Sequence, residues 1–102
     1  MSIAITPPEQ CMSMAQLREN IDLLDGELVA LLARRQGYIE RAAVLKTERG
    51  QIRDHARIED VVAKVRAGAG AKGLSPAIAE TVWRALIEAS IAHEYELFDR
   101  HA

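Results

Sequence analysis

Residues 13–48, SMAQLRENIDLLDGELVALLARRQGYIERAAVLKTE, contain no proline and predict one long helix. Ser13 followed by Gln16 is typical of a capping box at its start, and apolar residues then recur at steps of four and three, the spacing of one helical face. At about 1.5 Å per residue, this helix would be roughly 54 Å long, whereas a compact domain of this size has a radius of gyration of only ~13 Å. The helix therefore needs a partner, and a second copy of the chain is the simplest one.

Cationic side chains occupy positions on this helix where the pattern predicts apolar ones. The apolar series passes through Leu28 and Leu31 and then meets Arg35. Lys46 lies eleven residues further on, almost three whole turns, so the two cations project within ~20° of each other. Arg18 points roughly 100° away from Arg35 and lies ~25 Å down the axis, so it can serve only the pocket of an antiparallel partner helix. A pocket with two or three such cations suits a small dicarboxylate.

The composition predicts a helical protein of one domain. The chain has 102 residues, of which 49% are hydrophobic and only 4% aromatic, so the core is built mainly from aliphatic side chains. A net charge of -2 and dispersed basic residues argue against nucleic-acid binding. Cys11 is the only cysteine, which excludes an internal disulfide. We expect residues 1–12 to be a flexible N-terminus without signal-peptide features, residues 13–102 to form the domain, and the protein to be cytoplasmic, with no membrane contact.

Two further helices follow the long one. Asp54 is placed to cap a second, shorter helix that runs to about Ala67. The stretch GAGAKGLSP then predicts a connecting loop, because it lacks both the preceding strand and the GK[ST] ending of a phosphate-binding loop. Ser75 is placed to cap a third helix that runs to about Arg100. The fold class is therefore all-α, with three helices in the order long, short, long.

The third predicted helix carries polar residues in an apolar stripe. Ser90 and Glu94 recur in register with Trp83, Ile87 and Leu97, and polar groups that face a core need partners. Taken singly, each polar residue has an ordinary structural interpretation, such as a serine bonded to its own helix or a solvated cation. Only their joint occurrence indicates a site. The chain shows no Ser/His/Asp triad and its histidines lack metal-ligand spacing, so we expect no nucleophile, no metal and no cofactor.

This joint pattern resembles the all-helical (type II) chorismate mutases, a family of intertwined three-helix homodimers that includes the isochorismate-pyruvate lyases. The resemblance covers residues 14–98 and is carried by LRENIDLLDGELVALLARR, by AVLKTERG, by IRDHARIEDVV and by LIEASIAHE. The resemblance implies two groups of site residues: catalytic Arg35, Lys46 and Glu94, and substrate-binding Arg18, Asp54, Arg57 and Ser90.

The resemblance also implies a mechanism, the rearrangement of chorismate to prephenate without covalent catalysis. Arg35 and Arg18 of the partner subunit would hold the two carboxylates of the substrate and favour its folded, reactive conformer, a gain from orientation. Lys46 and Glu94 would stabilise the negative charge that develops on the breaking ether oxygen.

Two positions depart from the family pattern. Many members carry glutamine at the position of Glu94, and a carboxyl group must be protonated before it can donate a hydrogen bond, so we expect activity to rise toward acidic pH. Many mutases place a glutamate for the ring hydroxyl where this chain has Ile58, which leaves Asp54 as a substitute. An apolar residue there is similar to the lyases. An isochorismate-pyruvate lyase, a mutase of the 4-amino analogue and a non-catalytic dimerisation module therefore stay open.

Overall fold

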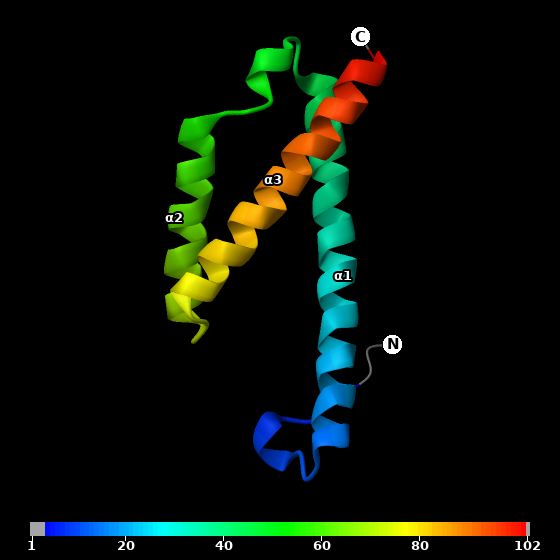
Figure 1. The fold of residues 1–102 in the computed structure, drawn as a ribbon, viewed down its shortest axis with the longest axis vertical. Helices are drawn as coiled ribbons and strands as arrows, with labels where there is room; N and C mark the ends of the chain where they lie inside the picture. The colour runs from blue at the N-terminus through cyan, green and yellow to red at the C-terminus, as the bar shows by residue number, and fades with distance from the viewer. Residues whose placement is uncertain (1–3, 102) are drawn as a thin grey trace. The chain divides into compact units, whose positions relative to one another are not determined.

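The computed structural model describes residues 4–101, which form three α-helices and two short 3-10 helices (Figure 1). No strand occurs among the described residues, so the all-α class and the order long, short, long are confirmed. None of the helices in this part of the chain is long and apolar enough to cross a membrane. The elements in order are η1 (Pro8–Gln10), α1 (Met14–Leu45), η2 (Arg49–Gln51), α2 (His55–Ala71) and α3 (Pro76–His101).

The boundaries of α1 follow from side-chain caps. Ser13 Oγ accepts a hydrogen bond from Gln16 N–H at 3.1 Å, as the capping box predicts, but the Gln16 side chain accepts from Met12 N–H instead of from Ser13. The helix ends at Leu45, so the predicted end at residue 48 is wrong by three residues. The N–H groups of residues 47 and 48 are bonded to Gln51 Oε1, at 2.9 and 3.0 Å, and this cap starts η2 in place of a further α-helical turn.

The structure consists of two compact units that meet between Gly37 and Tyr38, and α1 contributes residues to both. In the first unit, the segment before α1 is bonded to this helix: Thr6 N–H donates to Asn20 Oδ1 at 2.7 Å, and Asn20 Nδ2 donates to the Gln16 carbonyl at 2.8 Å. Asn20 is consequently buried and satisfied. The flexibility expected for residues 1–12 stays a prediction, and residues 1–3 lie outside the described part.

The second unit has an apolar core between α2 and α3. In Figure 1 the first half of α3 lies beside α2. The buried members are Ile52, Val62, Ile87 and Ile91. Partly buried residues that pack against them are Ile58, Val61, Trp83, Tyr95 and Phe98. Of the apolar stripe predicted for the third helix, Trp83 and Ile87 therefore face α2 in this core.

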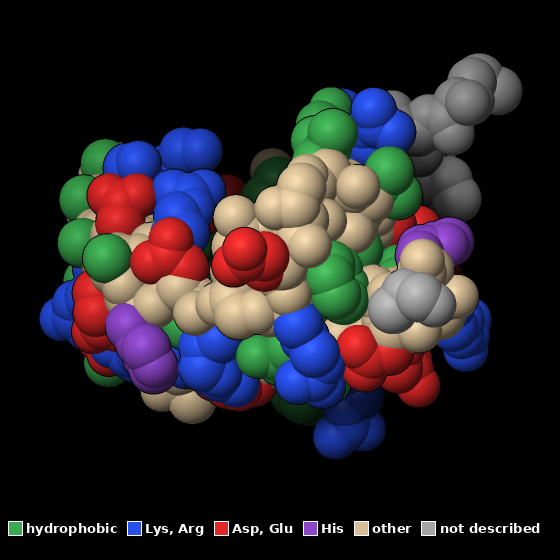
Figure 2. Space-filling view, turned by 90° about the horizontal axis from the view of Figure 1, so that it is seen from above, with side chains coloured by type: hydrophobic (Ala, Val, Ile, Leu, Met, Phe, Trp, Pro, Cys, Tyr) green, Lys and Arg blue, Asp and Glu red, His purple; other side chains and the backbone are tan. Residues whose placement is uncertain are grey.

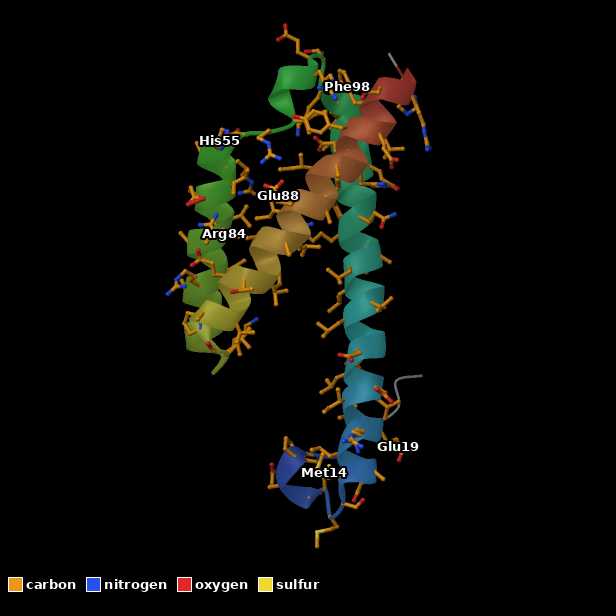
Figure 3. The ribbon with its side chains drawn as sticks, viewed as in Figure 1. Met14, Glu19, His55, Arg84, Glu88 and Phe98 are labelled. Carbon is orange, nitrogen blue, oxygen red and sulfur yellow. The ribbon has the colours of Figure 1, made fainter. Side chains whose placement is uncertain are left out.

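Ion pairs border this core on the solvent side. Figure 3 shows Arg84 and Glu88 projecting from α3 toward α2. Arg84 donates to Glu59 at 2.9 and 3.0 Å, and Glu88 accepts two hydrogen bonds from Arg53 at 2.8 Å. The arginines lower the pKa of both carboxyl groups, mainly through these hydrogen bonds.

The end of α2 corrects the predicted loop. The helix continues to Ala71, so residues 68–71, which were expected to belong to the loop, are helical. Ala69 is one of them and is buried. Two residues beyond this end, Gly73 has a φ of 79°, a left-handed conformation that suits glycine. Leu74 N–H then donates to the Ala69 carbonyl at 2.8 Å, and Gly73 N–H donates to the carbonyl of Gly70, which together form a Schellman motif.

Candidate active site

A buried carboxylate on α3 is paired with a lysine at the end of α1. Lys46 Nζ lies 3.1 and 2.8 Å from the two carboxylate oxygens of Glu94. Glu94 is only 4% exposed, whereas the Lys46 side chain is 28% exposed. The sequence pattern placed Glu94 in an apolar stripe, and the structure confirms that it faces the interior. Because a buried charge is costly without a partner, the ion pair with Lys46 stabilises the Glu94 carboxylate. The Lys46 side chain stays partly accessible to solvent.

Local structure holds both members of this pair. Glu94 lies one turn after Ile91 and two turns after Ile87, and both isoleucines are in the core, so packing sets the orientation of this face of α3. Lys46 is the first residue after α1, and its N–H still donates to the Ala42 carbonyl at 3.0 Å, so its backbone continues the helical hydrogen bonding.

Ser90 lies one turn before Glu94 on α3 and is half-buried. Its hydroxyl donates to the Leu86 carbonyl at 2.8 Å, the backbone bond that a helical serine commonly makes. A hydroxyl group has one O–H donor and two acceptor lone pairs, and this bond uses the donor. The structure thus places Ser90 and Glu94 on one face of α3.

Asp54 and Arg57 belong to the start of α2. Asp54 Oδ1 accepts a hydrogen bond from Arg57 N–H at 3.0 Å, which confirms the predicted cap. The Arg57 guanidinium donates to Asp60 at 2.8 Å, and its side chain is 63% exposed. Hydrogen bonds from Lys64 and Arg57 lower the pKa of Asp60. Arg57 therefore makes a local surface pair in the free chain.

A cavity of about 530 Å³ adjoins Lys46 and Asp54. This volume is within the range of small-molecule sites, ~300–1,000 Å³. Besides these two expected site residues, its lining includes Arg53 and His55, which the sequence analysis did not select. Figure 3 shows His55 at the beginning of α2. Their positions immediately on either side of the cap residue are a signal that could have identified them.

The cavity has a mixed electrostatic environment. Arg53 is engaged by Glu88, and this hydrogen bond raises the pKa of the guanidinium. Figure 2 shows Lys and Arg side chains interspersed with Asp and Glu on the face that it displays. The cations near the cavity thus lie on a surface with charges of both signs, and each would bind a ligand as a single group.

The two remaining expected residues, Arg18 and Arg35, lie on the part of α1 that belongs to the first unit. Arg18 is exposed and Arg35 is half-buried. Ile58 is half-buried against the core of the second unit, so its apolar side chain has a packing role. Among residues 4–101, no cluster of three or more His, Cys, Asp or Glu side chains could hold a metal ion.

Comparison with known proteins gives this arrangement a family. Residues 17–95 match the model of the type II chorismate mutases, which spans most of the chain. The chain therefore belongs to the type II chorismate mutase family. It is also similar to an isochorismate pyruvate lyase of Pseudomonas aeruginosa, with 29% identity over 87 residues that cover 85% of this chain and 86% of the relative.

Proposed function

We propose that the protein is a chorismate mutase that rearranges chorismate to prephenate. The observation that carries the proposal is the buried Lys46–Glu94 pair, of which the Lys46 end borders a cavity that also contacts Asp54. The family supplies the reaction class. The pair is suited to an ether oxygen that gains negative charge, because Lys46 has three N–H donors and bonds to Glu94 do not use all of them.

In this proposal the protein acts by binding and orientation. Arg35 and Arg18 of the partner subunit hold the two carboxylates, and Ser90 and Arg57 assist them. Arg57 would exchange its exposed bond to Asp60 for the substrate, at little cost because surface ion pairs are weak. Protonated Glu94 would donate a hydrogen bond from its O–H to the ether oxygen, and Asp54 would contact the ring hydroxyl.

We also propose that the active form is a homodimer. Several large apolar residues of α1 are about half or more exposed in the single chain: Leu28 by 55%, Val29 by 65% and Leu31 by 55%. On α3, Ile78 and Val82 are exposed by 56% and 50%. Exposed apolar surface on this scale favours association, and a second chain would also supply Arg18.

Turnover of chorismate by the purified protein tests the proposal. We expect chorismate to disappear with equal formation of prephenate, and Arg35→Ala and Lys46→Ala to lower kcat/KM by about a hundredfold or more. Glu80→Ala, a surface change on α3 away from the cavity, is the matched control and retains the wild-type rate. Absence of prephenate from a folded wild-type protein would contradict the proposal.

Isochorismate-pyruvate lyase activity is the second candidate. It is favoured by the similarity to the Pseudomonas aeruginosa relative of that name and by the apolar residue at position 58. Because Ile58 packs against the core, the structure itself explains an apolar residue at this position. Ile58 is therefore a weaker indication of which substrate is bound. Release of pyruvate with salicylate from isochorismate would support the lyase.

A further inference from the structure

A second polar pair joins the same two helices beside Lys46 and Glu94. His93 Nε2 on α3 lies 2.8 Å from Glu40 Oε2 on α1. The two side chains are 34% and 43% exposed, so the contact is partly protected from water. His93 directly precedes Glu94, and Glu40 lies six residues before Lys46. Both pairs therefore span the contact between the last turns of α1 and the second half of α3 (Figure 1).

The chemistry of the two groups determines which one donates the hydrogen bond between His93 and Glu40. An ionised carboxylate only accepts hydrogen bonds, so the imidazole must carry a proton on Nε2. This condition is met by the protonated ring and by the neutral tautomer that carries its proton on Nε2. A second carboxylate near the ring is that of Glu96, whose Oε2 lies 4.0 Å from His93 Nδ1 and whose side chain is 68% exposed.

Polar contacts are important here because α1 contributes only one small side chain, Ala43, to the buried apolar core. The buried cluster joins α2, α3 and Ile52, and contains no residue of α1. Close to Lys46, a further link to α3 is the pair of Arg49 with Asp99, whose side chains are 60% and 51% exposed and which is correspondingly weak. Besides the buried Ala43 and the Arg49 guanidinium 4.3 Å from the Tyr95 ring centre, the alignment of Lys46 with Glu94 thus depends on polar pairs, of which Glu40–His93 is better protected than Arg49–Asp99.

We propose that Glu40 and His93 are positioning residues that hold the end of α1 against α3, so that Lys46 and Glu94 keep the separation needed at the ether oxygen. This proposal rests on the proposed function. Neither residue reaches the cavity beside Lys46 and Asp54, so their effect on the reaction passes through the Lys46–Glu94 pair. Misplacement of a catalytic group by about 1 Å can cost on the order of a hundredfold in rate.

Steady-state kinetics of alanine variants test the proposal. We expect Glu40→Ala and His93→Ala each to lower kcat by about tenfold while KM stays within about twofold. Because the two residues act as one pair, the double variant should lose no more than either single variant. His93→Gln retains a side-chain N–H donor and should recover most of the lost kcat. Glu96→Ala, on the same face of α3 but exposed, is the control and keeps the wild-type kcat.

A spectroscopic measurement separates this proposal from the proposed function. The carboxyl carbon resonance of Glu94, followed by NMR in the substrate-free protein, should shift in Glu40→Ala and His93→Ala and stay unchanged in Glu96→Ala. An unchanged Glu94 resonance in folded variants, equal kcat values or a change confined to KM would overturn the positioning role. A wild-type protein that leaves chorismate unchanged would refute the proposed function alone, since the resonance still reports the pair. If the alanine variants fail to fold, His93→Phe, which keeps a ring but has no N–H donor, serves in the same comparison.

Discussion

Replacing Glu94 with glutamine tests whether this side chain donates a hydrogen bond during the reaction. Glu94 is 4% exposed, and its oxygens lie 3.1 and 2.8 Å from Lys46 Nζ, so the ionised form only accepts hydrogen bonds. A donor role requires a proton on this carboxyl group, so kcat should then rise toward acidic pH. Glutamine has an N–H donor at every pH, so the variant should lose this dependence.

The assay is the kcat for chorismate between about pH 5 and about pH 8. We expect a steady rise toward acidic pH for the wild type and a profile flat to within about twofold for Glu94→Gln. The amide oxygen can still accept from Lys46, so the free energy of unfolding should fall by only about 1 kcal/mol. Glu80→Gln is the matched control, because Glu80 lies fourteen residues earlier on α3, about 21 Å away along the axis. A wild-type kcat without pH dependence, or the same slope in the variant, would refute the donor role.

Three further predictions concern the pair, the dimer and acid stability. Lys46→Met removes the cation beside Glu94, and we expect kcat to fall about a hundredfold. Urea denaturation should show a loss of about 1–3 kcal/mol in the free energy of unfolding. This loss is smaller than for a fully buried pair because the Lys46 side chain is 28% exposed. Refolding Arg18→Ala with Arg35→Ala chains should restore about one working site per mixed dimer; no recovery in verified mixed dimers contradicts the shared site. Hydrogen bonds from two arginines lower the pKa of Glu80 from 4.5, so its contribution to stability is present above that pH and lost as pH falls through the folded value. The urea midpoint should drop between about pH 5 and about pH 3, and an unchanged midpoint contradicts this.

The starts of the helices were predictable because they depend on local chemistry. Asp54 and Ser75 accept hydrogen bonds from N–H groups three residues ahead, a relation visible in the sequence. The end of α2 was less predictable. Two glycines favoured a stop near Ala67, but burial of Ala69 and the positive φ of Gly73 extend the helix to Ala71. Tertiary contacts therefore override the weak helix propensity of glycine there.

In the candidate site, too, features that depend on local sequence were predictable and tertiary contacts were not. The interior position of Glu94 could be predicted from the period of α3, because its apolar neighbours share one face. Its pairing with Lys46 joins residues 48 apart in sequence and depends on how α1 meets α3, which periodicity does not determine. The same holds for Glu40 with His93, residues 53 apart, neither of which interrupts an apolar pattern conspicuously. The surface bond of Arg57 to Asp60 joins residues three apart in sequence, whereas the resemblance to the family implied that Arg57 contacts the substrate.

The most direct test of the proposed activity is the product ratio from an equimolar mixture of chorismate and isochorismate. Purified wild-type protein is incubated with both substrates, and prephenate, salicylate and pyruvate are measured together. We predict prephenate as the main product, with no pyruvate above the level released without protein. Salicylate and pyruvate formed in equal amounts, in excess of prephenate, would show that the chain is a lyase and contradict the proposed mutase activity.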